Sequence, residues 1–320
     1  MPAKTALVIS GGGSKGAFAV GAIEVLRGHD VKFDLVTGTS TGALIAPLVA
    51  TDEIPLLRHI YSTVRTPDVL TRRPGVIDIL GSDSIYDTSP LWTLINTYIT
   101  DARYQRILAA PAEVELCSVS LQSGEVTYFN PKKGVGGQPM ARDAFNRAIL
   151  ASASQPVLMP PVRLPGGDQF VDGGVREVTP LHRAVDAGAS EIYAIVLSPE
   201  KQQRQAKDYV FVVDTLLRTL DLLLTEVSAG DLDDALFYNQ ALNYMGRVRA
   251  KLGQRLSIAE LADAFEDGKP QNPFGNRRTL SLKIIRPAEE LPSDGLTFSP
   301  LIMSEMMAMG VAAAEQLFRA

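Results

Sequence analysis

The sequence predicts an α/β fold in three layers, with a mostly parallel central sheet between helices on both faces. Short apolar runs that read as strands alternate along the chain with helix-like segments, which is the pattern expected of a largely parallel sheet. The first two of these runs end in glycine-rich turns that lead directly into helices. The five clearest strand-like runs are residues 5–9, 33–36, 114–119, 126–129 and 192–197.

The turn after the first strand is the run Gly11–Gly16, which leads into a helix at 17–26. Amides at a helix start favour an anion, so this loop can hold a phosphate or an oxyanion. A P-loop is excluded because it needs Lys and then Ser or Thr directly after its last glycine, whereas Ala17 and Phe18 follow Gly16. The dinucleotide pattern G-x-G-x-x-G does match, with Asp34 at the spacing of a ribose ligand, but Asp34 opens the second strand instead of closing it. A non-hydrolytic nucleotide-binding or regulatory protein that uses this loop therefore stands as the alternative function.

The turn after the second strand has the form of a nucleophile elbow. It reads Gly38, Thr39, Ser40, Thr41, Gly42 between an apolar strand and an apolar helix. A serine on such a tight turn requires glycine two positions away on each side, because side chains there would collide with the neighbouring strand and helix. We interpret Ser40 as a candidate nucleophile; the simpler interpretation is a serine that only caps a helix.

A third motif, Asp172, Gly173, Gly174, follows what reads as the end of a short strand at 169–171. Glycines after the aspartate let a substrate or another backbone approach closely, and they allow a positive φ. Taken alone, this is an ordinary Asp-Gly turn.

Together these three motifs resemble the patatin-like phospholipase family, the lipid acyl hydrolases that use a Ser and Asp dyad. The Gly11–Gly16 loop with Lys15 is similar to the family's oxyanion-hole motif, Gly38–Gly42 to its nucleophile motif, and Asp172–Gly174 to its D-G-G motif. Further similarity lies in 85–91, in the hairpin-like stretch 116–129 and in 151–162. The resemblance implies a patatin-like fold and an oxyanion hole in the first loop. The loop residues so implicated are Gly11, Gly12, Gly13 and Gly16, with Lys15 in support.

The predicted chemistry is acyl transfer by Ser40 with Asp172 as its base. A serine hydroxyl needs a base in contact with it, and only three histidines compete for that role. His29 and His59 lie in polar or charged segments, and His182 lies in a stretch where Thr179 and Pro180 begin a helix leading away. Asp172 would take the Ser40 proton, return it to the departing alcohol and later activate water. Partial burial should raise the pKa of Asp172 toward the working range.

The later chain is predicted to complete one domain of residues 1–320 around core motifs at 5–197. Residues 201–268 read as a helical insertion whose apolar repeat favours core packing over a lid or membrane-facing cap. A loop at 268–278, a strand at 280–285 and a helix at 301–318 follow. Asp231, Asp233 and Asp234 are expected to stand at a helix start, where they favour the dipole and do not bind calcium.

Composition bounds the partners and the location. A net charge of -5 without long basic runs argues against nucleic acid. We expect no metal and no cofactor, since zinc and EF-hand patterns are absent. Cys117 is the only cysteine, and neither a signal peptide nor a membrane-spanning window is visible. The expected protein is therefore cytoplasmic, with signal-less secretion left open. Its expected substrate is a lipid or phospholipid met at a peripheral membrane or micelle surface, of unspecified head group and acyl chain.

Overall fold

The centre of the molecule is an eight-stranded mixed sheet with the strand order β10-β9-β1-β2-β5-β8-β7, and β6 pairs with β5. The structure is a computed structural model that describes residues 4–74, 81–134, 137–201, 204, 206, 208–269, 272, 274 and 279–319. The strands of the sheet are β1 Lys4–Ile9, β2 Leu35–Thr39, β5 Glu113–Ser120, β6 Val126–Phe129, β7 Val162–Arg163, β8 Gln169–Asp172, β9 Ala189–Ile195 and β10 Ser281–Ile285.

Five neighbouring strands, β10, β9, β1, β2 and β5, pair in parallel. The remaining pairs, which join β5 to β6, β5 to β8 and β7 to β8, are antiparallel. The predicted hairpin at 116–129 is present, with Leu116 opposite Phe129. A separate two-stranded sheet joins β3 Thr71–Arg72 to β4 Tyr86–Asp87. The predicted α/β class with a mostly parallel sheet is therefore confirmed.

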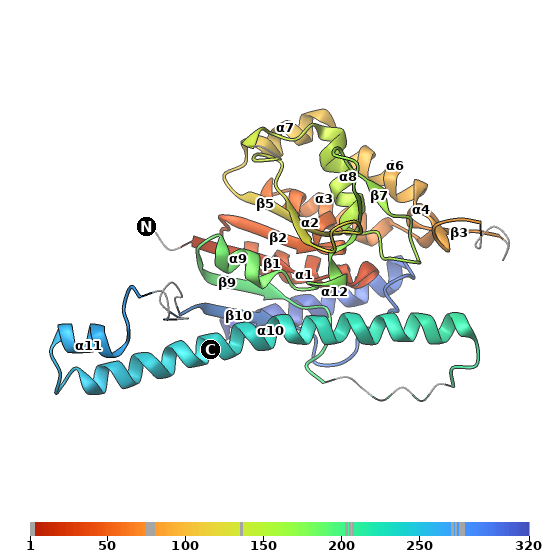
Figure 1. The fold of residues 1–320 in the computed structure, drawn as a ribbon. Helices are drawn as coiled ribbons and strands as arrows, with labels where there is room; N and C mark the ends of the chain where they lie inside the picture. The colour runs from red at the N-terminus through yellow and green to blue at the C-terminus, as the bar shows by residue number, and fades with distance from the viewer. Residues whose placement is uncertain are drawn as a thin grey trace.

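Helices cover both faces of the sheet (Figure 1). One face packs against a large apolar core that includes α1, α2, α3, α6, α8 and α12. The other face packs against α9 and the middle of α10, where Leu181, Ala184 and Leu232 meet Ala6 and Val8 of β1. The helices are α1 Gly16–Gly28, α2 Thr41–Ala50, α3 Ile54–Thr63, α4 Thr66–Val69, α6 Ser89–Tyr98, α7 Asp101–Ala109, α8 Arg142–Ser152, α9 Leu181–Asp186, α10 Val212–Leu252, α11 Ile258–Ala264 and α12 Pro300–Glu315.

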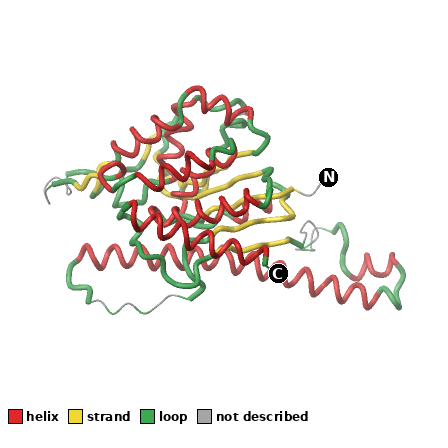
Figure 2. The backbone as a smooth tube through the Cα atoms, turned by 180° about the vertical axis from the view of Figure 1, so that it is seen from behind, coloured by secondary structure: helices red, strands yellow, loops and turns green. Residues whose placement is uncertain are grey.

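The longest element, α10, has 41 residues and runs past the edge of the sheet, as the view from behind shows (Figure 2). At 1.5 Å per residue it is about 60 Å long. Helix was predicted from residue 201, but it begins at Val212, and Asp231 lies within it and not at its start. Part of the predicted loop at 268–278 lies outside the described residues.

The closing helix α12 lies on α1, and two glycines permit the close approach. A Cβ on Gly21 would lie 1.9 Å from Met307 O, and one on Gly310 would lie 2.0 Å from Phe18 O. Residues 300–318, which include the short helix η4 Gln316–Phe318, are long and apolar enough to cross a bilayer by length and composition, with 28% of that window buried. This corrects the prediction that no window reaches that length.

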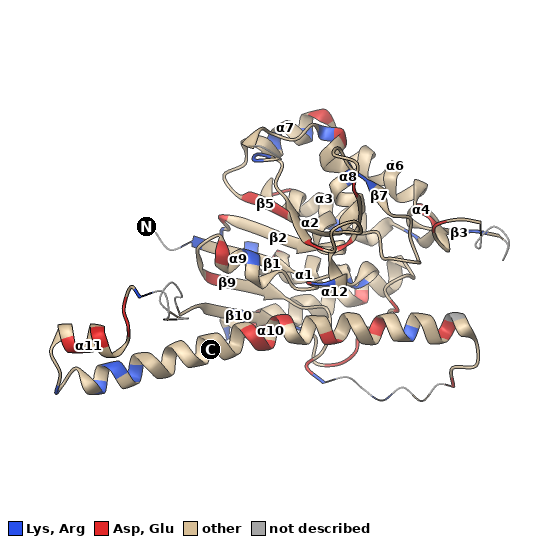
Figure 3. Ribbon diagram, viewed as in Figure 1, with Lys and Arg blue, Asp and Glu red and all other residues tan. Residues whose placement is uncertain are grey.

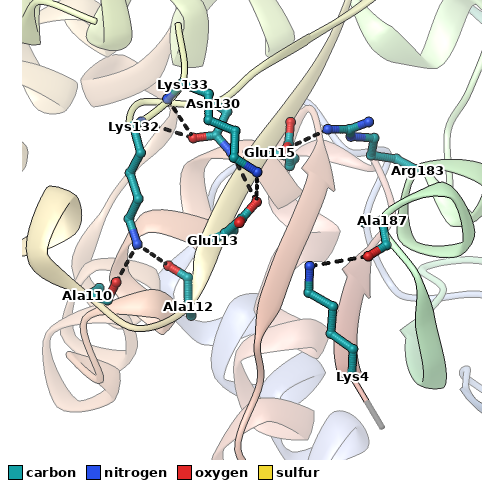
Figure 4. Close-up of polar contacts among 10 residues, drawn as sticks. All are labelled: Lys4, Ala110, Ala112, Glu113, Glu115, Asn130, Lys132, Lys133, Arg183 and Ala187. Carbon is teal, nitrogen blue, oxygen red and sulfur yellow. Dashed lines mark hydrogen bonds and ion pairs between the residues drawn. The ribbon is translucent and has the colours of Figure 1, made fainter. Parts of the chain in front are cut away.

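The edge of the sheet where β1 and β5 begin carries a polar network that fixes β5 (Figure 4). Glu115, which is 1% exposed, accepts hydrogen bonds from Asn130 Nδ2 at 3.0 Å and from Arg183 Nη2 at 2.7 Å. Lys133 Nζ lies 2.7 Å from Glu113 Oε2. Because parallel strands end at the opposite edge, this network is separated from the glycine-rich turns by the length of the strands.

Candidate active site

Ser40 lies on a strained turn between β2 and α2. Its φ of 58° and ψ of -120° are a conformation that non-glycine residues rarely adopt. A Cβ on Gly38 would lie 2.3 Å from the carbonyl carbon of Gly42, and a Cβ on Gly42 would lie 2.3 Å from Ile9 O. Glycine is thus required at both positions by close backbone contacts, as the motif indicates.

A second serine, which the sequence analysis did not identify, supports the elbow. The Ser40 N–H donates to Ser152 Oγ at 3.1 Å, and Ser152 Oγ donates to Cys117 O at 2.5 Å. Ser152 ends α8 and is fully buried. It lies in the 151–162 stretch that carries part of the family resemblance. That position was the only feature of the sequence that could have pointed to Ser152.

Asp172 is brought to Ser40 by the register of β5. Thr39, the last residue of β2, pairs with Cys117, and Asp172, the last residue of β8, pairs with the next residue, Ser118. Leu116 and Cys117 pair with both β2 and β6, and Ser118 and Val119 pair with both β8 and β6. Strands β2 and β8 therefore share the edge of β5 opposite β6. Since β2 is parallel and β8 antiparallel to β5, the two strands run toward each other and their ends meet.

The Asp172 carboxylate is 6% exposed and is held by short-range contacts. Its Oδ1 accepts a hydrogen bond from the Gly174 N–H at 2.8 Å, and the carboxylate lines the same pocket as Ser40. Burial raises the pKa of Asp172 from 3.8 to about 6, and the Gly174 N–H and the nearby Ser40 hydroxyl offset part of that rise. The carboxylate is therefore both ionised near neutral pH and more basic than an ordinary aspartate.

The two glycines after Asp172 permit close packing and not a positive φ. Neither has a positive φ, which corrects that part of the prediction. A Cβ on Gly173 would lie 2.6 Å from Cys117 O, and one on Gly174 would lie 3.0 Å from Asp172 Oδ1. Both positions therefore exclude a side chain beside the carboxylate.

The first glycine loop places two amides beside Ser40. Within the described part of the chain, no protein acceptor is recorded for the N–H groups of Gly12 and Gly13. Gly11 N–H donates to Val178 O at 3.0 Å, and Gly16 N–H donates to Gly13 O within the loop. Of the four loop glycines, Gly12 and Gly13 are therefore the two whose N–H groups have no protein acceptor among the described residues.

Gly11 and Gly16 have packing roles instead. A Cβ on Gly11 would lie 3.2 Å from Ser40 Cβ, and one on Gly16 would lie 2.2 Å from Thr41 Oγ1. Gly13 has a φ of 57°, and a Cβ there would lie 2.0 Å from Gly295 O. The loop is thus fitted against the elbow on one side and against the 293–298 segment on the other.

A pocket of about 440 Å³ joins these groups. Ser40, Asp172, Gly12, Gly13 and Lys15 all line it. Its other wall comes from the 290–298 segment and from the first half of α10, neither of which was predicted to form the site. The lining residues from α10 are Asp214, Leu217, Arg218, Asp221, Leu224, Thr225 and Ser228.

Two buried contacts fasten α10 beside the D-G-G turn. Asp231 Oδ2 accepts a hydrogen bond from the Thr179 N–H at 2.8 Å, and the hydroxyls of Thr179 and Ser228 lie 3.2 Å apart. Burial raises the pKa of Asp231 to about 7. In the described residues, no group of three or more His, Cys, Asp or Glu side chains is placed to hold a metal ion.

The competing residues lie apart from the pocket. His182 is 51% exposed, lies 3.8 Å from Glu177 Oε1 and does not line the pocket; helix α9 begins at Leu181, after Pro180. His29 stacks on Phe318. Asp34, the candidate ribose ligand, precedes β2 and accepts a hydrogen bond from the Thr5 N–H at 2.9 Å, so it lies at the end of the sheet opposite the glycine loop.

Comparisons with known proteins agree with this arrangement of motifs. A family model described as "Patatin-like phospholipase" matches residues 7–185. The chain is 28% identical over 218 residues to the uncharacterized protein YqhO of Bacillus subtilis, covering 63% of this chain and 74% of that one. It is 27% identical over 197 residues to lysophospholipase NTE1 of Debaryomyces hansenii, covering 59% and 11%. It is 24% identical over 196 residues to Patatin-2-Kuras 4 of Solanum tuberosum, covering 54% and 51%. The matched region is thus a small part of the lysophospholipase and about half of the potato protein.

Proposed function

This chain belongs to the patatin-like phospholipase family, and we propose that it is a lipid acyl hydrolase with Ser40 as nucleophile and Asp172 as base. The observation that carries the proposal is that Ser40 and Asp172, which follow or end strands that meet on neighbouring residues of β5, line one pocket. Activity of the phospholipase A, lysophospholipase or general lipid acyl hydrolase type fits this site.

In the first half of the reaction, Ser40 Oγ attacks the ester carbonyl carbon while its proton passes to Asp172. The carbonyl oxygen becomes an oxyanion, and the N–H groups of Gly12 and Gly13 are its donors. The ester C–O bond then breaks, and Asp172 gives the proton to the departing alcohol. Water activated by the same carboxylate cleaves the acyl-enzyme, releases the fatty acid and restores Ser40.

Lys15 is proposed to attract the anionic part of a lipid head group. It is half-buried, lines the pocket, and has no ion-pair partner among the residues that the structure describes. A phosphate that entered near Ser40 would meet this cation and the start of α1, where the helix dipole also favours an anion. Arg218 on the opposite wall is already paired with Asp221. Lys15 is therefore better placed than Arg218 to form an ion pair with a bound anion.

The proposed site of contact with a membrane or micelle is the outer face of α10 near its start. Between residues 210 and 225 the charged residues are Asp214, Arg218 and Asp221, and all three line the pocket. The exposed residues of this stretch are uncharged and mostly apolar, with Phe211 69% and Val212 85% exposed beside the exposed Thr215 and Thr219. This orientation is the reverse of an ordinary surface helix and fits burial in a lipid surface. We call this surface the α10 outer patch; its residues are Val210, Phe211, Val212, Leu222 and Leu223.

The proposed dyad is tested with a fluorophosphonate probe, which labels an activated serine. We expect the wild type to be labelled and to hydrolyse p-nitrophenyl butyrate, and Ser40→Ala to lose both properties while keeping its circular dichroism spectrum. The matched control is Ser198→Ala, which removes another serine hydroxyl from the same pocket and should leave labelling intact. Labelling that persists in folded Ser40→Ala would assign the nucleophile to another serine and exclude this mechanism, and a wild type that is neither labelled nor active would favour the non-hydrolytic alternative.

A further inference from the structure

A second, apolar cavity lies directly beside the pocket that contains Ser40. Its volume is about 70 Å³, and it lies between α2, α3 and α6. A space of about 10–15 Å³ already admits one water molecule, and a methylene group is close to water in size. The cavity therefore has room for several methylene groups.

The cavity and the pocket share part of their walls. Leu44, Val69, Leu91 and Phe298 line both spaces. Leu44 stands in the first turn of α2, and its N–H donates to Ser40 O at 3.3 Å. The shared wall therefore begins one helical turn from the nucleophile.

The walls of this cavity offer few hydrogen-bond partners to a water molecule. All of the side chains that line it are aliphatic, aromatic or Met, and its polar side-chain atoms belong to Tyr61 and Tyr98. The Tyr61 hydroxyl is already hydrogen-bonded to Thr41 Oγ1, next to Ser40. Apolar cavities of this kind stay dry and bind apolar ligands.

The cavity continues away from Ser40 toward the surface between α3 and α6. Ile60, Leu94 and Tyr98 line only the cavity and not the pocket, and all three are partly buried. The deeper wall is made of fully buried residues such as Leu57 and Ile149. A linear apolar group could thus extend from Ser40 between two helices.

We propose that this cavity is the subsite for the acyl chain of the substrate, and that Leu94 helps to set the accepted chain length. The inference rests on the proposed function, because it supposes an acyl group on Ser40. It divides the substrate by polarity: the acyl chain enters between α3 and α6, and the head group remains on the side of Lys15 and α10.

The test is the chain-length profile of kcat/KM for p-nitrophenyl esters from acetate to dodecanoate. For the wild type we expect a rise of roughly fourfold for each methylene until the cavity is filled. For Leu94→Trp, the ratio of kcat/KM on octanoate and longer esters to kcat/KM on acetate should fall about tenfold or more below that of the wild type. Leu94→Ala should shift the preference toward longer chains.

The matched control is Thr93→Trp, which adds the same ring to α6 at an exposed position that lines neither space. It should keep the wild-type profile. Ile60→Phe fills the cavity from α3 and serves if Leu94→Trp fails to fold. A folded Leu94→Trp or Ile60→Phe whose profile equals that of the wild type would overturn the proposal.

A binding measurement separates this proposal from the proposed function. In a Ser40→Ala background, dodecanoate binding by calorimetry should weaken about tenfold with Leu94→Trp and stay unchanged with Thr93→Trp. If the wild type hydrolyses no ester but binding still depends on Leu94, the hydrolase proposal fails and the subsite stands. If hydrolysis depends on Ser40 but neither rate nor binding depends on Leu94, the subsite fails and the hydrolase proposal stands.

Discussion

Ser40 and Asp172 line one pocket at the point where β2 and β8 meet end to end beside β5. Neighbouring residues of one buried strand, Cys117 and Ser118, pair with the ends of these two strands and so set the distance between the two side chains. The dyad geometry is thus a consequence of strand register, because a shift of one residue would turn the side chains to the opposite face.

The pH dependence of hydrolysis should report Asp172. The carboxylate accepts a proton only when it is ionised, and burial raises its pKa to about 6. We expect kcat/KM for p-nitrophenyl butyrate to be level above about pH 7 and to fall about tenfold per pH unit well below pH 6. A stopped-time assay across this range gives the inflection. An inflection near the ordinary aspartate value of 3.8 would contradict this assignment.

Asp172→Asn should stabilise the protein while inactivating it. The pKa of Asp172 is higher in the folded chain than the ordinary 3.8, so the native state binds this proton more tightly and loses stability as pH rises from about 4 to about 6. The difference between 3.8 and about 6 corresponds to roughly 3 kcal/mol above that range. The amide keeps an acceptor for the Gly174 N–H and carries no charge.

Urea unfolding measures this effect. At about pH 8, Asp172→Asn should have a free energy of unfolding up to about 3 kcal/mol higher than the wild type, and near pH 4 the two should converge. The exposed carboxylate Asp233 offers the control Asp233→Asn, which should show no such pH-dependent difference. If Asp172→Asn is less stable than the wild type at both pH values, the claim that the buried Asp172 charge destabilises the fold is wrong.

Much of the site could be predicted because its motifs are local. The elbow depends on Gly38 and Gly42, whose missing side chains are visible in the sequence. The second strand was placed at 33–36 instead of 35–39 because Thr37, Gly38 and Thr39 have the composition of a turn. Pairing with β1 on one side and β5 on the other overrides that preference.

The rest of the site depends on contacts between distant segments and left no local signal. For example, the Gly11 N–H is not free because it donates to Val178 O, a carbonyl from a distant part of the sequence. Asp231, Asp233 and Asp234 read as a helix start, yet they lie within α10, where Asp231 accepts a hydrogen bond from the Thr179 N–H. The wall that α10 contributes to the pocket follows from that contact.

Gly42→Ala should destabilise the fold severely. A Cβ at this position would lie 2.3 Å from Ile9 O, a backbone atom of a buried strand that cannot move aside cheaply. The expected loss is at least about 2 kcal/mol of unfolding free energy, measured by urea denaturation. The control is Gly246→Ala in α10, where a Cβ meets nothing within 4 Å; it should stabilise the helix by about 0.5–1 kcal/mol. Equal stability of both variants would show that Gly42 is not sterically required.

The α10 outer patch should govern binding to lipid surfaces. Phe211→Asp places a charge in the most exposed apolar part of the patch and should reduce cosedimentation with phosphatidylcholine vesicles about tenfold or more. Phe237→Asp is the matched control, since Phe237 is 66% exposed and Phe211 is 69% exposed on the same segment. Phe237 follows the acidic Asp233 and Asp234, and basic residues gather further along near α11 (Figure 3). If the two variants lose vesicle binding equally, the patch has no special role.

His182→Ala distinguishes a dyad from a Ser, Asp, His triad. The chain order of Ser40, Asp172 and His182 is that of α/β-hydrolases, in which the histidine takes the serine proton. Here the imidazole is 51% exposed, lies outside the pocket, and has its Nδ1 3.8 Å from Glu177 Oε1. Because Asp172 lines the pocket with Ser40 and His182 does not, the imidazole is not placed to take the serine proton. We therefore expect kcat/KM of His182→Ala to stay within about twofold of the wild type. The exposed control His59→Ala should behave in the same way. Loss of a general base would instead lower kcat/KM about a hundred- to ten-thousandfold. A loss of that size in His182→Ala, with the pH inflection near 6 abolished, would assign the base to His182 and reduce Asp172 to its orienting partner.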